Sequence, residues 1–460
     1  MSDTQFTKTP GTDATNNKIF TLSFWTKRTT AGDGGLGSYS RILSAGSDYY
    51  IRFENSDQLK AEMHSSGAAY KTNMLFQDNS AWYHIVWQVD TSQAVAGDRV
   101  TAWVNGVEVT SWAESSAPSQ DHNMDFNKNG TTQYWGSDAS AGQWYNGYFA
   151  QICMIDGTTY AASVFGSTDA TTGEWKPKSD GEIRSAVNFG NNGYLLSFEN
   201  ASNPGYDYQT SDRSGTTNDF SKSGNGYKTA DNPSDNQPLI NNWAFKVGMS
   251  YSFTNALQSV AFSTSDWASL PTTLGPGDSG KWYFEAKQSS LSNYAQVGFM
   301  TSDFANFGGF EGYFGQEAGN VPSYGYGQDG KIYYSNTSTS GVSSSADWET
   351  YTSGDICMCA LDLDNNFVYF GKNGTWGNSG DPTSGATGTG GYAIENPSGS
   401  LWVAGVAAYN GTWQTNFGNG YFGTTAVSSG NADDGGLGTF EYDVPTGYRM
   451  ICSKNIKTYG

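Results

Sequence analysis

Basic residues are scarce in this chain of 460 residues. Lys and Arg together number 24, against 44 Asp and Glu, and the formal net charge at pH 7 is −20. The basic residues form no cluster along the sequence. Electrostatic attraction to nucleic acid or to an anionic membrane is therefore disfavoured, and we expect neither as a partner.

Cysteine and histidine are also rare. Four cysteines are too few for a disulfide framework in a chain of this length, so we expect buried, reduced thiols. The histidines lie far from the paired cysteines in the sequence, which disfavours a Cys/His metal site. These residues are Cys153, Cys357, Cys359 and Cys452, and His64, His84 and His122.

Long apolar runs are missing as well. The first twenty residues, MSDTQFTKTPGTDATNNKIF, lack the basic region and apolar stretch of a signal peptide. No uninterrupted apolar stretch approaches the ~20 residues of a membrane-spanning helix. We therefore expect a protein made in the cytosol, with neither a signal peptide nor a transmembrane segment.

No segment of ten or more residues has a convincing helical period, whereas glycine (58 residues) and aromatic residues (15%) are abundant. This composition is typical of proteins with many short strands and turns. We predict an all-β fold of two antiparallel β-sandwich domains, residues 1–200 and 243–460. The polar residues 201–242 between them are predicted to be a connector, because they are rich in Ser, Asn, Asp and Gly.

Several strands are visible as alternating segments. Examples are Ile19–Arg28 and Ala81–Asp90, and the run Arg99–Val109, which the turn sequence Asn105-Gly106 divides into a hairpin. Glu174–Pro177 is predicted to lie in a loop, because proline cannot join an inner ladder.

Alternation also predicts a hairpin in DICMCALDLDNNFVYFGKNG, residues Asp355–Gly374. The turn falls at Asp364-Asn365-Asn366, since Asn and Asp tolerate left-handed conformations. Both faces of the first strand are apolar, as in a strand inside a two-layer sandwich. One face carries Ile356, Met358 and Ala360, and the other carries Cys357, Cys359, Leu361 and Leu363.

The same stretch has a second interpretation as a calcium loop. Asp362, Asp364 and Asn366 have the spacing that opens an EF-hand. That motif also needs Gly at its sixth position and Glu at its twelfth, where this chain has Phe367 and Asn373. We favour the hairpin.

Two groups of aromatic residues are candidates for binding sugars, because flat rings stack on the apolar faces of pyranoses. Core filling is the alternative for each of them. Those in the second domain lie in FANFGGFEGYFG, which lacks strand alternation and suits contact with a partner. The candidates are Tyr134, Trp135, Trp144 and Tyr145 in the first domain, and Phe310 and Tyr313 in the second.

The first two hundred residues resemble the laminin-G-like, concanavalin A-type jelly roll. The segments that carry this resemblance are FTLSFWTKR, AWYHIVWQVD with DRVTAWVNGVEV, and YWGSDASAGQWYNGYFAQICMIDG. The second half resembles a SPRY domain, a β-sandwich that binds proteins. Its segments are Ser279–Ala286, residues 354–374 and Pro445–Ile451.

The resemblance to laminin-G-like domains suggests calcium as the one cofactor to consider. Asp212 and Asp219 lie in an oxygen-rich loop, which fits a hard cation. Asp, Ser and Gly also make ordinary turns, and this is the interpretation that we favour. We otherwise expect no cofactor.

Catalytic motifs are not evident. Jelly-roll glycanases carry alternating acids of the form E-x-D-x-x-E on one strand, and the first half has no such run. There is no G-x-S-x-G elbow, and His84 lies in a strand as a core or edge residue. We expect no enzymatic activity.

The pairing of these two modules is similar to structural proteins of tailed marine bacteriophages. This resemblance implies a virion protein, such as a tail-fibre or receptor-binding component, that contacts host surface glycan or protein. Its expected partners are other virion proteins and further copies of itself. The alternatives are a head decoration protein without host binding, a cellular lectin or adhesin, and a polysaccharide depolymerase.

Overall fold

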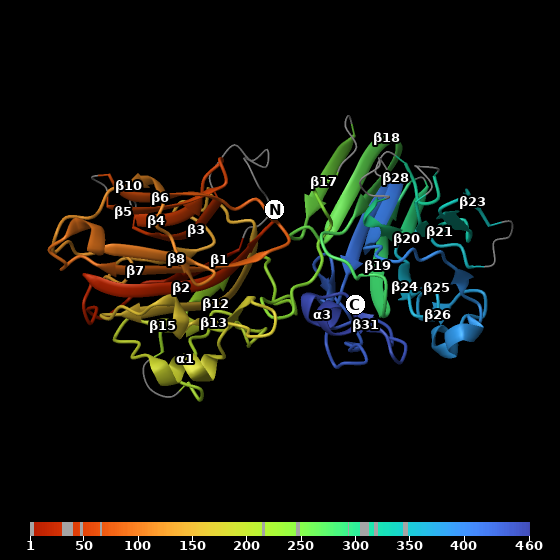
Figure 1. The fold of residues 1–460 in the computed structure, drawn as a ribbon. Coiled ribbons are helices and arrows are strands. Elements are labelled where there is room, and N and C mark those ends of the chain that lie inside the picture. The colour runs from red at the N-terminus through yellow and green to blue at the C-terminus, as the bar shows by residue number, and fades with distance from the viewer. Residues whose placement is uncertain are drawn as a thin grey trace. The chain divides into compact units, whose positions relative to one another are not determined.

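The structure is a computed structural model that describes residues 4–29, 40–46, 49–64, 67–213, 217–244, 249–292, 294–303, 312–316, 321–343 and 348–460. The chain divides into two compact units, Met1–Lys228 and Thr229–Gly460 (Figure 1). Residues 201–242, predicted as a connector, are shared between the units. The first part belongs to the first unit, where β16 (Ser221–Ser223) pairs with β1 (Gln5–Lys8).

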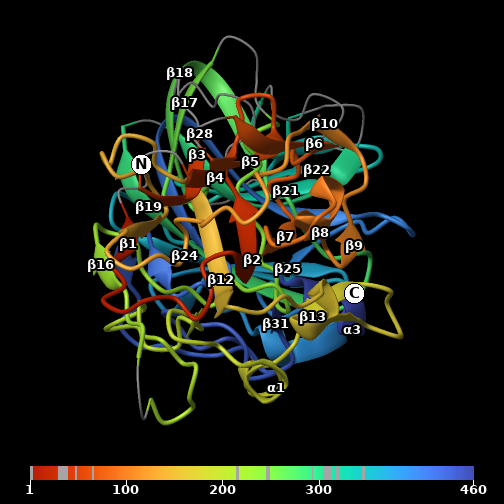
Figure 2. The ribbon, with the colours of Figure 1, turned by 90° about the vertical axis from the view of Figure 1, so that its left-hand side faces the viewer.

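Two antiparallel sheets form the first unit (Figures 1 and 2). The eight-stranded sheet has the order β10 (Trp112–Ser115), β6 (Ala68–Leu75), β5 (Gln58–His64), β4 (Tyr49–Phe53), β3 (Ser40–Ala45), β11 (Gln133–Trp135), β1 and β16. The six-stranded sheet has the order β15 (Tyr194–Leu196), β12 (Gly147–Asp156), β2 (Ile19–Arg28), β7 (Trp82–Asp90), β8 (Val100–Val104) and β9 (Val107–Glu108).

The main core of the first unit lies between these sheets. Strand alternation turns Phe20, Leu22 and Phe24 of β2 inward, where they join Ile42 and Ile51 from the other sheet. A second apolar cluster covers the opposite face of the six-stranded sheet and includes a residue of α1 (Asp180–Ala186). Both faces of that sheet are therefore buried, and polar side chains gather on the outer face of the eight-stranded sheet.

Thirteen strands of the second unit form a single hydrogen-bonded network arranged in two layers, and β29 (Tyr421–Phe422) and β30 (Thr425–Ala426) form a separate pair. β28 (Trp402–Asn416) belongs to both layers, because its first half pairs with β20 and its second half with β19. One layer continues through β20 (Ala295–Thr301), β21 (Ser323–Gly327), β22 (Ile332–Ser335) and β23 (Ser340–Val342). The other continues through β19 (Lys281–Leu291), β24 (Ile356–Asp362), β25 (Phe367–Lys372) and β26 (Thr375–Trp376).

The remaining elements of the second unit lie around these layers. β18 (Ser259–Pro271) pairs along β28 with a shift in register, and β17 (Ser250–Thr254) pairs with β18. β31 (Arg449–Met450) runs parallel to β19, whereas the other pairs are antiparallel. The short elements are β27 (Tyr392–Ala393), β29 (Tyr421–Phe422), β30 (Thr425–Ala426) and α3 (Ser453–Tyr459). The prediction of an all-β fold with two antiparallel sandwiches is confirmed.

The hairpin predicted at residues 355–374 is confirmed as β24 and β25. Cys357, Cys359 and Leu361 enter the core between the two layers, whereas Met358 and Ala360 join a cluster on the other face. Both faces of the strand are therefore covered, as its sequence predicts.

The acids of this hairpin are engaged within the protein. The Oδ2 atom of Asp362 lies 2.9 Å from the Nζ atom of Lys281, and the Oδ1 atom of Asp364 accepts a hydrogen bond from the Gly280 N–H. These contacts give both carboxylates a structural role at the end of the hairpin.

The turn at Asn105-Gly106 is also confirmed, since both residues have positive φ, 48° and 79°. The loop prediction for Glu174–Pro177 is wrong. β14 (Trp175–Pro177) pairs with β13 (Gly166–Thr168) in a separate two-stranded ribbon. Each strand of such a ribbon has an open edge, so a residue without an N–H is tolerated there.

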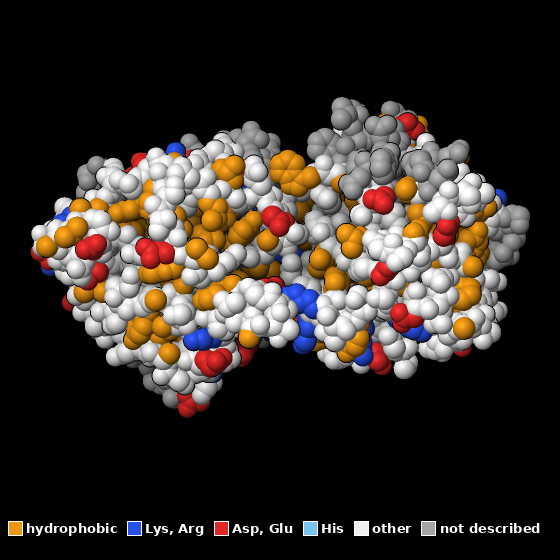
Figure 3. All heavy atoms as spheres, in the orientation of Figure 1, with side chains coloured by type: hydrophobic (Ala, Val, Ile, Leu, Met, Phe, Trp, Pro, Cys, Tyr) orange, Lys and Arg blue, Asp and Glu red, His pale blue; other side chains and the backbone are white. Residues whose placement is uncertain are grey.

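All four cysteines are buried and unpaired, and burial raises the pKa of each thiol. Among the described residues, no helix has the length and the apolar character needed to cross a bilayer. On the face drawn in Figure 3, acidic side chains are scattered among uncharged ones.

Candidate functional site

Four aromatic side chains follow one another on the outer face of one layer of the second unit. We call Tyr294, Trp267, Tyr313 and Tyr333 the aromatic strip. Neighbouring ring centroids in this order are separated by 5.9, 5.2 and 5.8 Å. Tyr294 exposes 54% of its surface, and the other three are half-buried. Rings at this spacing stabilise one another while parts of them stay open to solvent.

Strand alternation places two of these rings on the outer face. Ala268 of β18 and Ile332 of β22 belong to the core between the layers. Their neighbours Trp267 and Tyr333 therefore point the opposite way, because successive side chains of a strand alternate between faces. β18 and β22 are joined through β28, β20 and β21, whose labels appear in Figure 1.

Tyr313 is held in the strip by the residue that follows it. Phe314 is fully buried on the outer face of the layer, and its N–H donates to Oε1 of Gln296 over 2.8 Å. Glycine makes room for the ring: a Cβ atom at Gly325 would lie 2.4 Å from the Cβ atom of Phe314. Phe314 therefore anchors the segment and fixes Tyr313 between Trp267 and Tyr333.

Polar groups border the strip at one end. The hydroxyl of Tyr333 donates to Oδ2 of Asp329 over 3.0 Å, and burial raises the pKa of Tyr333 to about 12. The hydroxyl is therefore protonated at neutral pH. Aromatic faces beside a few fixed hydrogen-bonding groups are the arrangement that sugar-binding sites use.

Sequence reasoning found one member of the strip and missed three. Tyr313 was a candidate, and Phe310 lies outside the described residues. Trp267, Tyr294 and Tyr333 lie in or beside strands, where aromatic residues usually fill cores. Alternation could have assigned Trp267 and Tyr333 to an outer face, but their proximity depends on strands distant in sequence.

The structure corrects two of the first-domain candidates. Trp135 is fully buried, and its Nε1–H donates to the hydroxyl of Tyr194; Tyr145 is 2% exposed and packs in the same core. Alternation along β11 turns Trp135 inward, and Tyr145 reaches the same core from the loop before β12, so core filling is the correct interpretation for both. Tyr134 and Trp144 are half-buried, and Tyr134 lies on the outer face of the eight-stranded sheet.

The acidic loop near the end of the first unit forms an ion pair. Both carboxylate oxygens of Asp219 contact the guanidinium of Arg213, at 3.1 and 2.8 Å. Asp212 is exposed. Within the described ranges, no group of three or more His, Cys, Asp or Glu side chains is arranged to hold a metal ion.

Two carboxylates approach one another on the outer face of the eight-stranded sheet. Nζ of Lys60 lies 3.2 Å from Glu62 and 3.3 Å from Glu114. The ammonium group thus occupies the space between the acids. A glycosidase would instead keep that space open for the scissile bond.

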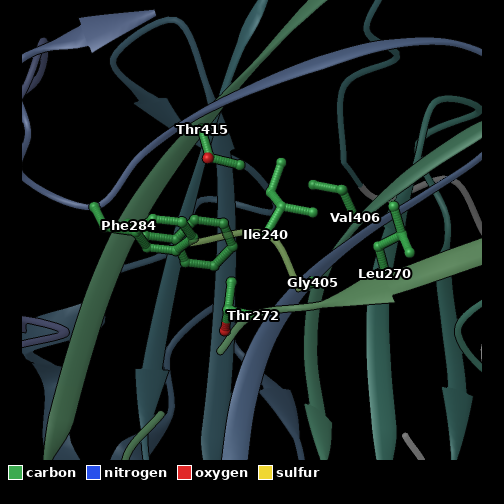
Figure 4. Close-up of a pocket in the computed structure, with 8 residues that line it drawn as sticks. Ile240, Leu270, Thr272, Phe284, Gly405, Val406 and Thr415 are labelled. Atoms are coloured by element: carbon green, nitrogen blue, oxygen red, sulfur yellow. The ribbon is translucent and has the colours of Figure 1, made fainter. Parts of the chain in front are cut away.

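A small interior space in the second unit is lined mainly by apolar core residues, together with Thr272 and Thr415, as Figure 4 shows. Ile240, Leu270, Phe284 and Val406 around it are all buried. It therefore belongs to the packing of the core and offers no route for a ligand.

Comparison with known protein families finds a similarity in the first part of the chain. Residues 2–165 match the concanavalin A-like lectin/glucanases superfamily. The matched region contains most strands of both sheets of the first unit. No curated protein sequence matches the chain.

Three solved structures illustrate the similarity of fold. The SPRY domain of human HERC1 is 13% identical, with a TM-score of 0.27, over 36% of this chain and 96% of that domain. Domains LG4-5 of the mouse laminin α1 chain are 9% identical, with a TM-score of 0.27, over 90% of this chain and 85% of theirs. Carbohydrate-binding module CBM66 of Bacillus subtilis is 7% identical, with a TM-score of 0.23, over 37% of this chain and 89% of the module. Similarities this distant decide nothing about ligand or activity.

Proposed function

We propose that this chain is a non-enzymatic, glycan-binding protein and that the aromatic strip is its binding surface. The observation that carries the proposal is the unbroken series of ring contacts from Tyr294 to Tyr333 on the outer face of the second unit. The match of residues 2–165 to the concanavalin A-like lectin/glucanases superfamily supports a carbohydrate ligand. The ammonium of Lys60 between Glu62 and Glu114 argues against a hydrolase.

We further propose that the chain is a structural protein of a tailed-phage particle and that it contacts host surface glycan. It follows from the resemblance of the paired modules to phage proteins. Its other partners are virion proteins and further copies of the chain. Repetition on a particle converts a weak single site into strong attachment.

Binding of neutral oligosaccharides to the full chain tests the strip. Trp267→Ala and Tyr313→Ala are each expected to weaken binding of the best ligand on a glycan array about fivefold to thirtyfold, as for an interface hot spot. Trp243→Ala is the matched control, since Trp243 is 56% exposed in the same unit but makes no ring contact with the strip. If Trp267→Ala and Tyr313→Ala bind the glycan with the same affinity as Trp243→Ala, the strip is ruled out as the binding surface.

Mass spectrometry of purified phage particles tests the virion assignment, and absence of the chain would overturn it. A cell-binding assay then distinguishes a receptor-binding component from head decoration, which gives no host binding. Release of reducing ends from envelope glycan would instead identify a depolymerase.

A further inference from the structure

Four basic residues are aligned across the eight-stranded sheet of the first unit. Arg41 on β3 is opposite Arg52 on β4, Arg52 is opposite Lys60 on β5, and Lys60 is opposite Lys71 on β6. Figure 2 labels these strands in the first unit. With ~4.8 Å between strands, the row spans roughly 14 Å. Like charges opposite one another destabilise a sheet, so the row needs compensating anions.

Side chains of the same unit neutralise only the middle of the row. Arg52 pairs with Glu54 at 2.7 Å, and Lys60 pairs with two glutamates. Arg41 and Lys71 at the two ends have no ion-pair partner within the described part of the chain.

The guanidinium of Arg41 is held in place without an anion. Its Nε–H donates to Oε1 of Gln143 over 2.7 Å, and its Cζ atom lies 3.9 Å from the centroid of the Tyr50 ring. The two terminal nitrogens have no hydrogen-bond partner among the described residues. Arg41 is therefore ordered and half-buried, and its two terminal nitrogens keep N–H donors that the described residues do not use.

Tyr50 is fixed from two further directions. Its hydroxyl donates to Oε2 of Glu62 over 3.1 Å, and the Cζ atom of Arg52 lies 4.5 Å from the ring centroid. Two guanidinium groups thus share one aromatic ring. Burial and the charge of Arg52 lower the pKa of Arg41, whereas the nearby charges of Asp138 and Glu62 raise it. A bound anion would further favour the charged guanidinium.

Gln143 is positioned by its own loop. Oδ1 of Asp138 accepts hydrogen bonds from the N–H groups of Gly142 and Gln143, at 2.7 and 3.4 Å. This loop holds the amide that orients Arg41. The donor pair is therefore built by contacts from β3, β4 and the 138–143 loop.

We infer that Arg41, stacked on Tyr50, binds the acidic group of an anionic saccharide, either a carboxylate or a sulfate ester. A guanidinium fork matches the two oxygens of such a group, whereas a lysine ammonium does not. In the neighbouring cross-strand row, Tyr134 is opposite Ser44, and Ser44 is opposite Tyr50. Tyr134 therefore lies near the site and offers a ring surface to the sugar. The inference rests on the proposed function only in that the ligand is a saccharide, because the site and the strip lie in different units.

Calorimetric titration of the full chain with three probes tests the site: tetragalacturonate, dextran sulfate and neutral maltotetraose. Arg41→Gln is expected to weaken binding of an acidic probe about tenfold or more, and Arg41→Lys by less, because lysine keeps the charge but loses the fork. Lys71→Gln is the matched control, which removes an equivalent charge from the other end of the row. It is expected to change affinity less than about twofold, since a distant charge on a surface is screened.

Tetragalacturonate carries carboxylates and dextran sulfate carries sulfate esters, so the two probes show which acidic group is bound. Arg41-dependent binding of either one supports the site. No binding of either probe, or equal losses in Arg41→Gln and Lys71→Gln, would overturn it. Tighter Arg41-dependent binding of poly-glutamate than of both saccharides would also overturn it, in favour of an acidic protein segment. Thermal unfolding confirms that each variant is folded. Trp267→Ala should leave binding of the acidic probes unchanged. The experiments can therefore reject the aromatic strip as a glycan-binding surface without rejecting the Arg41 site, and the reverse.

Discussion

Arg28 and Asp57 form an ion pair that connects the two sheets of the first unit, with 3.1 Å between Nη1 and Oδ1. The two side chains are only 2% and 6% exposed. Nη1 of Arg28 also donates to the carbonyl oxygen of Phe76, and its Cζ atom lies 4.3 Å from the centroid of the Phe53 ring. The charges are thus removed from water and held by several contacts at once.

Arg28→Met is expected to destabilise the first unit by about 3–5 kcal/mol, because it leaves the Asp57 carboxylate buried without its cation. Adding Asp57→Asn should recover part of that loss. Asparagine tolerates the positive φ of 63° at this position and carries no charge. Urea unfolding of the single and double variants measures both effects. A cost below about 1 kcal/mol for Arg28→Met would mean that the pair behaves like an exposed one.

His84 is neutral in the folded first unit. Its Nδ1 atom accepts a hydrogen bond from the indole N–H of Trp175 over 2.9 Å, so the proton is on Nε2, which donates to Oγ of Ser23 over 2.8 Å. Burial lowers the pKa of His84 from 6.5 to about 3. The unfolded chain therefore binds a proton that the folded chain does not over this range.

Stability that depends on neutral His84 is present above pH 6.5 and is lost as the pH falls toward about 3. His84→Gln should therefore reduce the acid sensitivity of the first unit between these values, although it lowers stability at pH 7. Urea unfolding at several pH values, followed by tryptophan fluorescence, compares the two slopes. Identical slopes for the variant and the parent chain would contradict the prediction.

Glu285 has the opposite linkage in the second unit. Its oxygens accept hydrogen bonds from the hydroxyl of Tyr283, the amide of Asn416 and the N–H groups of Glu441 and Tyr442. Burial nevertheless raises its pKa from 4.5 to about 7. Between these values the folded state binds more protons than the unfolded state, so stability falls as the pH rises.

Glu285→Gln should flatten the pH dependence of unfolding between about pH 4.5 and 7. It should also cost about 1–3 kcal/mol, because the new NH₂ group faces a donor that the carboxylate satisfied. Chemical unfolding at pH 5, 6 and 7.5 measures both effects. A variant whose stability still falls across this range as steeply as that of the parent would show that another group is responsible.

Phe314→Ala tests how the aromatic strip is positioned. Removing a buried phenylalanine costs about 3–5 kcal/mol where the surroundings cannot collapse, and here it releases the segment that holds Tyr313. Glycan affinity should fall as much as in Tyr313→Ala, although Phe314 is buried beneath the strip. Phe314→Leu, which keeps most of the buried volume, should retain binding. Unchanged binding in Phe314→Ala, or a loss in Phe314→Leu as large as in Phe314→Ala, would contradict the anchoring role.

Local pattern was sufficient for much of the fold. The hairpin of β24 and β25 was predicted with its turn and with the assignment of alternate side chains to two faces, because alternation and Asn/Asp turn chemistry act over a few residues. The same reasoning failed at Pro177, since the exclusion of proline applies to inner strands and not to a two-stranded ribbon. It failed at Trp135, which alternation along β11 turns inward, and at Tyr145, which lies outside the strands and reaches the core from the loop before β12.

The sequence alone therefore determined that the chain is all-β, where its strongly alternating strands lie and where its tightest turns fall. Only the tertiary structure decided which outward side chains meet. Trp267 and Tyr313 come together because β28 pairs with β18 on one side and with β20 on the other. Arg41 lies opposite Arg52 because of the register between β3 and β4. The physical reason is the distance along the chain over which each feature is set. Strand periodicity depends on neighbouring residues, whereas a binding surface depends on pairing between segments far apart in the chain.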